Sequence, residues 1–143
     1  MAPDVERLRA LLLSRRPGVL VTIGGDGRPQ LSNVDYTFSP EDGVVRISTT
    51  ADRVKVRNIR RDARVSLYAT TSDGGAWAVA DGTAELSPVA TSTDDPTVEQ
   101  LIEVYRAIQG EHPDWQDYRA AMVADRRLVI HIAVSRLYGW MPA

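Results

Sequence analysis

The chain has 143 residues, 43% of them hydrophobic, and a formal net charge of −2. That length permits one domain with a real core, and the acidic balance argues against a general nucleic-acid binder, which is usually basic over a broad face. The absence of cysteine excludes disulfides and thiolate chemistry, and two isolated histidines, His112 and His131, argue against a metal centre. We therefore expect one domain over residues 1–143, no metal, and chemistry supplied by a bound group.

No run of eighteen apolar residues occurs in the chain. The first sixteen residues, MAPDVERLRALLLSRR, carry acids and arginines within their apolar stretch, unlike the uninterrupted apolar segment of a signal peptide. These two features predict a cytoplasmic protein with no membrane partner.

The first half of the chain reads as one helix followed by strands. Apolar residues at helical spacing predict a helix from Asp4 to about Arg15, ended by Pro17 and Gly18. The strand-like runs that follow are Val19–Ile23, Pro29–Phe38 and Val44–Thr49. The turn at residues 24–27 joins two strands and lacks phosphate-loop spacing, which favours a plain hairpin.

A short helix is expected over Ala51–Asp62, with Val54 and Ile59 turned inward. The strands expected after it are Ala63–Ala69, Ala76–Leu86, Leu128–Val134 and Leu137–Met141. Two helices precede the last pair of strands.

The first of these helices has Asp95 as N-cap, Pro96 at its first position and Gly110 at its end, and the second spans about residues 113–125. Seven or so antiparallel strands with helices inserted late predict a mainly β fold. We expect a closed or split Greek-key barrel with peripheral helices.

The strongest local signal lies where the third strand passes into the short helix, over residues 48–58. Backbone N–H groups, the positive end of the helix dipole and hydroxyl groups converge there, which favours a phosphate ligand. Arg53 can donate two hydrogen bonds to phosphate oxygens, and Lys55, the only lysine in the chain, adds a compact charge. The residues of this candidate site are Ser48, Thr49, Thr50, Arg53, Lys55 and Asn58. A solvated basic helix capped by Thr50 is the equally weighted alternative.

The charge distribution agrees with a local anion site. Residues 52–64 hold six Arg or Lys against two Asp, a local charge of +4, so the rest of the chain carries −6. A concentrated positive segment on an acidic chain indicates a compact anionic ligand more than an extended polyanion.

Other polar and aromatic residues have less specific patterns. Gln30 and Ser32 face one side of their strand and Asn33 the other, so a single ligand can contact only some of them unless a bulge intervenes. Trp77 reads as core or as an aromatic wall for a planar ring, and His131 as a structural histidine in an apolar strand. No hydrolase motif is present, so the sequence does not indicate nucleophilic catalysis.

Four segments read together resemble the split β-barrel oxidoreductases related to pyridoxamine 5′-phosphate oxidase, and more narrowly their actinobacterial branch that uses the deazaflavin coenzyme F420. The segments are GVLVTIGGDGRPQLSNVDYTFSP, ISTTADRVKVRNIRRDARVSL, WAVADGTAEL and DWQDYRAAMVADRRLVIHIAVSRLYGW. The resemblance covers nearly the whole chain in the same order. It implies a homodimer with two cofactor sites at the subunit interface.

The resemblance also implies roles for particular residues. Ser48, Arg53, Lys55 and Asn58 match the motif that binds the cofactor phosphate. Gln30, Ser32 and Asn33 match the strand along the cofactor ring. Trp77, Ala78 and Val79 match the segment that the opposite subunit contributes. One departure is Gly75, which stands where close relatives can carry an aromatic, so that Trp140 becomes the alternative wall of the ring pocket.

The expected activity is hydride transfer from reduced F420 to an electron-poor small molecule, with Tyr36 as a conceivable proton donor. Three alternatives stay open: an FMN enzyme of the oxidase type, a non-catalytic F420 or flavin carrier, and an oligonucleotide-binding barrel. The last is disfavoured because aromatic and basic residues are not interleaved. Quinones, tetrapyrroles such as biliverdin and unsaturated lactones are compatible acceptors.

Overall fold

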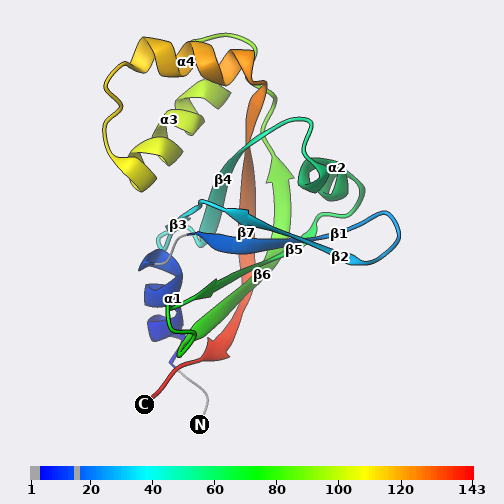
Figure 1. Ribbon diagram of the computed structural model, residues 1–143, viewed down its shortest axis with the longest axis vertical. Coiled ribbons are helices and arrows are strands. Elements are labelled where there is room, and N and C mark those ends of the chain that lie inside the picture. Colours follow the sequence, from blue (N-terminus) through cyan, green and yellow to red (C-terminus); the bar gives the residue numbers. More distant parts are fainter. Residues whose placement is uncertain (1–3, 15–16) are drawn as a thin grey trace.

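The computed structural model describes residues 4–14 and 17–143. One antiparallel sheet of seven strands curls into a half-barrel, and its strand order is β2-β1-β5-β6-β7-β4-β3 (Figure 1). The strands are β1 (Gly18–Ile23), β2 (Pro29–Val34), β3 (Thr37–Ser39), β4 (Val44–Thr50), β5 (Arg64–Thr70), β6 (Trp77–Leu86) and β7 (Arg127–Trp140). The helices are α1 (Val5–Ser14), α2 (Val54–Arg61), α3 (Pro96–Gln109) and α4 (Trp115–Ala124). The expected mainly β split barrel with peripheral helices is confirmed.

The edges of the sheet come from one continuous segment of the chain. The sequence predicts a single strand over Pro29–Phe38, but the structure divides it into β2, which pairs with β1, and β3, which pairs with β4. The interruption lies at Asp35 and Tyr36, and the Tyr36 side chain turns fully into the core. The chain thereby crosses from one edge of the sheet to the other, which curls the sheet into a half-barrel.

The predicted closing strands Leu128–Val134 and Leu137–Met141 are one strand, β7. Its register against β6 shifts between Asp81 and Gly82, which pair with Arg136 and Val134 and leave Ser135 as an extra residue. Such a bulge bends a strand without ending it. The prediction of two strands was therefore wrong at this point, because a bulge interrupts the alternation of the sequence while the pairing continues.

The barrel interior holds the main core, which contains Leu20, Ile47, Leu67 and Ile130. Alternate residues of each strand face this core, as the burial of β4 and β5 shows. α1 packs against β6 and β7. Its buried residues are Leu8, Leu11 and Leu12, as helical spacing predicts, and Arg15 lies outside the described residues.

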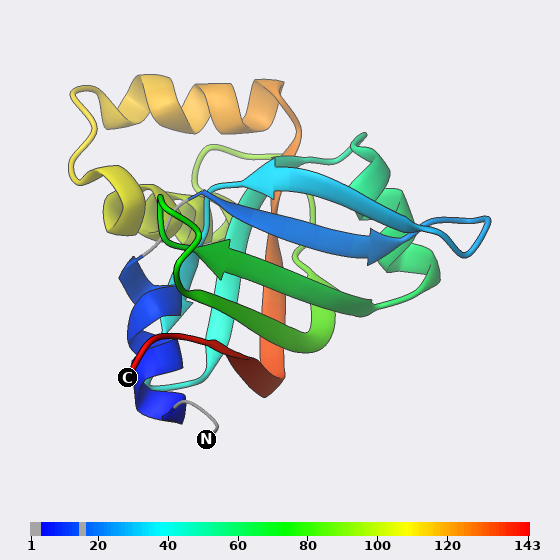
Figure 2. The same ribbon diagram turned by 60° about the horizontal axis from the view of Figure 1, so that its bottom comes forward.

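α2 is shorter than predicted, and one of its inward residues was assigned wrongly. Val54 is 47% exposed, whereas Val56 and Ile59 are buried. Val54 is the first residue of the helix, so the buried face begins two residues later. α2 packs against β1 and β6, at the side of the barrel from which the β1–β2 hairpin projects (Figure 2).

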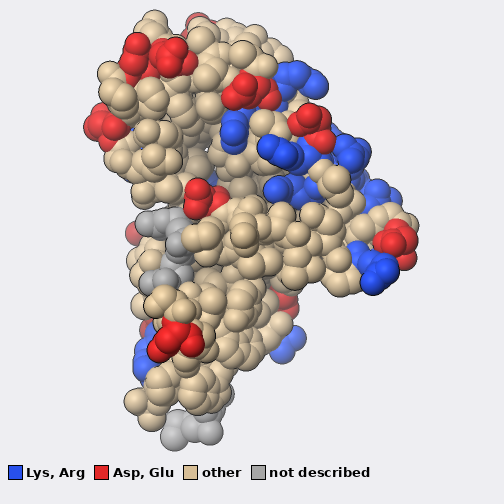
Figure 3. All heavy atoms as spheres, in the orientation of Figure 1, with Lys and Arg blue, Asp and Glu red and all other residues tan. Residues whose placement is uncertain are grey.

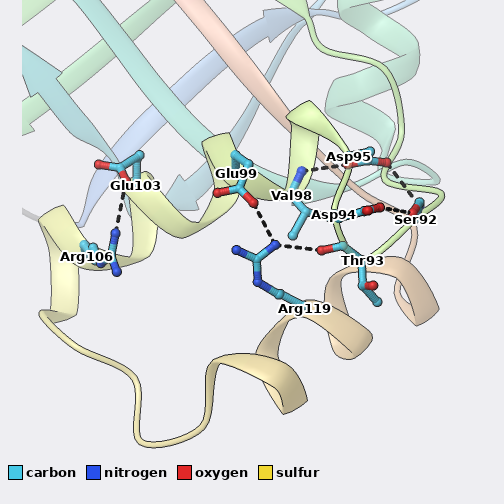
Figure 4. Close-up of polar contacts among 9 residues, drawn as sticks. All are labelled: Ser92, Thr93, Asp94, Asp95, Val98, Glu99, Glu103, Arg106 and Arg119. Atoms are coloured by element: carbon cyan, nitrogen blue, oxygen red, sulfur yellow. Dashed lines mark hydrogen bonds and ion pairs between the residues drawn. The ribbon is translucent and has the colours of Figure 1, made fainter.

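α3 and α4 form a helical hairpin that rises above one end of the barrel (Figure 1). The predicted N-cap is confirmed, because the Asp95 carboxylate accepts a hydrogen bond from the Val98 N–H. Arg119 of α4 donates to the Thr93 carbonyl at 2.8 Å and pairs with Glu99 of α3 at 2.7 Å (Figure 4). These contacts fix α4 against α3 and the preceding loop, so the hairpin presents one defined face toward the barrel.

Within the described residues, none of the helices has both the length and the apolar character needed to cross a membrane.

Candidate functional site

A cleft of about 580 Å³ lies between the helical hairpin and the end of the barrel where β4 passes into α2. The barrel side supplies mostly polar residues: Asn33, Val34, Asp35, Ser48, Thr49, Thr50, Arg53, Lys55 and Arg127. The hairpin side supplies mostly apolar ones: Val104, Tyr105, Ile108, Gln109, Tyr118 and Met122. Figure 3 shows Lys and Arg gathered over α2, beside the recess beneath the hairpin. The cleft therefore has one cationic wall and one apolar wall.

The cationic wall is built by residues 48–55, which we call the elbow. Ser48 and Thr50 lie on one face of β4 because side chains alternate along a strand. Arg53 follows as the N-cap residue of α2, and its own side chain makes no capping hydrogen bond. The Thr50 hydroxyl donates to the Asp52 carboxylate at 2.9 Å. Thr50 thus does not cap α2 as the alternative interpretation of this segment expected.

The two cations of the elbow have no anionic partner within the described part of the chain. Among residues 4–14 and 17–143, no carboxylate lies within ion-pair distance of Arg53 or Lys55. The pKa of Lys55 is lowered from 10.5, first by burial and then by the positive charge of Arg53. A partly buried lysine beside another cation is stabilised by a bound anion, since the anion offsets both effects.

Arg127 is a site residue that the sequence analysis missed. It is the first residue of β7 and pairs in register with Thr50, and its Nη1 donates to the Ser48 hydroxyl at 3.2 Å. Its Nε is buried without a hydrogen-bond partner among the described residues. The local signal was only an arginine at a strand start, and its place in the cleft depends on the pairing of β4 with β7.

The hairpin side of the cleft is aromatic and aliphatic. Tyr105 and Tyr118 lie 5.0 Å apart between ring centroids and form part of a cluster with His112 and Trp115. Burial raises the pKa of Tyr118 to about 12, and its hydroxyl donates to the Leu101 carbonyl at 3.0 Å. Tyr118 therefore stays neutral, and this wall can contact a planar apolar group.

Of the residues predicted from the sequence, the structure brings six together in the cleft. They are Asn33, Ser48, Thr49, Thr50, Arg53 and Lys55. All except Asn33 belong to the elbow. Among the described residues of β2, Asn33 is thus the only polar one that lines the cleft and could contact a ligand ring.

Gln30 and Asn58 lie outside the cleft in a hydrogen-bonded network. The buried Asn58 donates to the Thr22 hydroxyl at 3.0 Å, and that hydroxyl donates to the Gln30 side chain at 3.0 Å. Arg61 Nη2 donates to the side-chain amide oxygen of Asn58, Oδ1, at 2.7 Å. This network joins α2 to β1 and β2, so these residues position the elbow.

Ser32 and Tyr36 are also outside the cleft. The Ser32 hydroxyl oxygen is buried and has no hydrogen-bond partner among the described residues. Tyr36 is fully buried in the barrel core, where its hydroxyl donates to the Leu12 carbonyl of α1 at 2.6 Å. The structure therefore gives Tyr36 a contact inside the protein and no place in the wall of the cleft.

Trp77, Ala78 and Val79 lie on β6, away from the cleft. Ala78 is buried under α1, and Trp77 faces outward between Tyr68 and Tyr138, each 6.2 Å away between ring centroids. Trp140 pairs with Trp77 in register and is 53% exposed. The outer face of the sheet thus carries a cluster of aromatic side chains, which we call the outer aromatic face (Tyr68, Trp77, Tyr138 and Trp140).

Comparisons with known proteins agree with this architecture. Among curated proteins, the F420H(2)-dependent biliverdin reductase of Mycobacterium tuberculosis (strain CDC 1551 / Oshkosh) is 28% identical over 130 residues, covering 91% of this chain and 83% of that protein. Among solved structures, a conserved hypothetical protein of Mycobacterium tuberculosis has a TM-score of 0.75 at 27% identity, over 99% of this chain and 86% of the other. A structure described as an F420 reductase has a TM-score of 0.69 at 22% identity, over 90% and 94% of the two chains, and shows the shared fold.

The family model described as pyridoxamine 5′-phosphate oxidase matches residues 5–141, nearly the whole chain. The curled antiparallel sheet, the peripheral helices and the extent of this match agree with one another. The chain belongs to the pyridoxamine 5′-phosphate oxidase family.

Proposed function

We propose that the protein is an F420-dependent reductase that transfers a hydride from reduced F420 to an electron-poor small molecule. The observation that carries this proposal is a pair of cations, Arg53 and Lys55, that have no ion-pair partner in the part of the chain that the structure describes. They line a cleft of about 580 Å³ whose opposite wall is apolar. The relative from Mycobacterium tuberculosis, named for F420 and biliverdin, supports the choice of cofactor and of reaction class.

The residues of the cleft fit an anionic, planar cofactor. Arg53, Lys55 and the N-terminal end of α2 would hold its phosphate, as a guanidinium, an ammonium and free backbone N–H groups commonly do. Bound F420 supplies the hydride, so the protein needs no nucleophile of its own. Its residues would bind and orient the cofactor on the barrel side, where Asn33 lies, and the apolar hairpin side would exclude water.

We further propose that two subunits associate through the outer aromatic face. The β6 segment of Trp77, Ala78 and Val79 would then lie near the partner's cleft, with the outward-facing Trp77 as its contacting side chain. Tyr138 and Trp140 are exposed side by side with the half-buried Tyr68 and Trp77, and exposed large aromatic side chains are typical of an interaction surface. Analytical ultracentrifugation should give a dimer for the wild type and a shift toward monomer for Trp140→Asp, which places a charge in that surface. A monomeric wild type at micromolar concentration would contradict this part of the proposal.

The cofactor assignment is tested by titrating F420 and FMN separately into the wild type and Lys55→Ala. We expect F420 to bind more tightly than FMN, and the variant to lose roughly 1–3 kcal/mol of F420 binding, as for a lost charge-assisted contact. Arg28→Ala is the matched control, because it removes an exposed cation on the β1–β2 hairpin outside the cleft.

Three other results would lead to different conclusions. Tighter binding of FMN, with reactivity toward oxygen, would indicate the oxidase type. Tight F420 binding without reduction of any acceptor in a broad screen would indicate a carrier. Equal F420 affinity of Lys55→Ala and the wild type would remove the elbow as the cofactor site.

A further inference from the structure

The cleft contains a cation that the phosphate site does not require. Arg127 reaches Ser48 with Nη1 but leaves Nε buried and without a partner. A buried unpaired donor on a charged group costs stability, so its presence calls for an explanation. No carboxylate of the described residues lies within ion-pair distance to provide one.

Arg127 reaches the cleft from β7, whereas Arg53 and Lys55 reach it from the N-cap and first turn of α2. Its backbone pairs with Thr50, but its guanidinium reaches back along β4 to Ser48, two residues before Thr50. Two residues of a strand correspond to about 6–7 Å. Arg53 and Lys55 lie three and five residues after Thr50, whereas Ser48 lies two residues before it.

Electrostatic neighbours agree with this separation. The positive charge of Arg127 acts on Tyr118 of the hairpin and opposes the rise in its pKa, whereas the cation that lowers the pKa of Lys55 is Arg53. Arg127 and Tyr118 line the same cleft, and the charge of Arg127 reaches this residue of the apolar wall.

We propose that Arg127 and Ser48 form a second oxyanion subsite, which binds a carboxylate of the hydride acceptor while the acceptor's conjugated body contacts Tyr105, Ile108 and Met122. This inference rests on the proposed function and narrows its acceptor to planar, conjugated carboxylic acids. A guanidinium binds a carboxylate through two of its N–H groups. Arg127 lines the cleft and has no ion-pair partner among the described residues, so its charge is available to such a ligand. Arg127 is thus a specificity-determining residue rather than part of the phosphate site.

An acidic group of the cofactor is the other possible source of the same anion. The composition of the opposite wall favours the acceptor, because the aliphatic and aromatic side chains of α3 and α4 complement a conjugated apolar body. A polar chain of acidic groups would leave that wall in contact with water. Comparing an acidic acceptor with its ester distinguishes an anion of the acceptor from one of the cofactor.

The first test compares biliverdin with its dimethyl ester as acceptors for F420H2-loaded enzyme, because the two differ only in their carboxylates. For biliverdin we expect Arg127→Gln to raise KM roughly 10- to 100-fold, and Arg127→Lys to restore part of the loss by keeping the charge without the paired N–H groups. For the ester, KM should be unchanged in both variants. Arg28→Gln, which removes an exposed charge outside the cleft, should leave both acceptors unaffected.

The second test needs neither cofactor nor turnover. Calorimetry on the cofactor-free protein should show 2-naphthoate binding more tightly than 2-naphthamide, with the difference lost in Arg127→Gln and kept in Arg28→Gln. Because this readout is independent of F420, it still tests the subsite if the protein proves not to bind F420. Failure of the proposed function would instead appear as absent F420 binding by the wild type.

Three results would overturn the inference. The first is an equal effect of Arg127→Gln on biliverdin and its ester, which indicates a purely structural role. The second is a loss of F420 affinity as large as that of Lys55→Ala, which assigns Arg127 to the cofactor. The third is equal affinity of the wild type for naphthoate and naphthamide.

Discussion

Replacing Tyr36 by Phe distinguishes a structural role of the Tyr36 hydroxyl from a catalytic one. The Tyr36 hydroxyl donates to the Leu12 carbonyl at 2.6 Å inside the core. Leu12 belongs to the last four residues of α1, whose carbonyls have no partner within the helix. The variant loses this bond and leaves a buried carbonyl without it, so we expect a loss of about 1–3 kcal/mol in the free energy of unfolding.

Urea denaturation measures this loss as a lower midpoint at unchanged slope. Turnover of the folded variant should equal that of the wild type, because the hydroxyl lies in the core rather than in the cleft wall. Tyr105→Phe is the stability control, since no hydrogen bond of its hydroxyl is found among the described residues, and we expect a change within roughly 0.5 kcal/mol. An unchanged urea midpoint for Tyr36→Phe together with slower turnover would refute this reasoning and favour a proton-donor role.

Two further substitutions test the stability of the fold around the site, and a pH titration tests the charge of Lys55. Asn58→Ala removes the buried bond to Thr22 and should lower the free energy of unfolding by about 1–3 kcal/mol in urea; no loss would mean that the network is not stabilising. Gly139→Ala should destabilise the barrel by at least about 1–3 kcal/mol, because the new Cβ would lie 2.1 Å from the Trp77 carbonyl oxygen; a wild-type melting temperature would contradict that geometry. Burial and the charge of Arg53 lower the pKa of Lys55 from 10.5. F420 affinity measured by calorimetry should therefore fall as the pH rises and Lys55 loses its proton, and Lys55→Arg, which keeps its charge, should abolish the fall. Identical pH profiles of the two proteins would exclude Lys55 as the titrating group.

Local sequence patterns predicted most of the elements. The alternation of β1, β4 and β5, the cap of α3 at Asp95 and the apolar spacing of α1 all depend on residues close together in the chain. The elbow was visible for the same reason, since the hydroxyls and cations of residues 48–55 are consecutive and belong to one strand-to-helix connection. Short-range periodicity and capping are sufficient for such predictions.

Two errors in strand boundaries arose where pairing decides the outcome. Pro29–Phe38 has the composition of one strand, but the burial of Tyr36 divides it between opposite edges of the sheet. The sequence predicted two strands in place of β7 because the bulge at Ser135 disturbs the alternation of apolar and polar residues. Asn58 belongs to the candidate phosphate site predicted over residues 48–58, and its side chain bonds to Thr22, which does not line the cleft.

The amino-acid sequence by itself determined the fold class, the cationic elbow and the family, because each is written in contiguous residues or in the order of motifs. Only the tertiary structure placed the α3–α4 hairpin above the elbow and brought Arg127 beside Ser48, which lies 79 positions earlier. Those contacts depend on long-range strand pairing and on the burial of side chains from distant segments. No local window of sequence contains them, and they decide which molecule the cleft can hold.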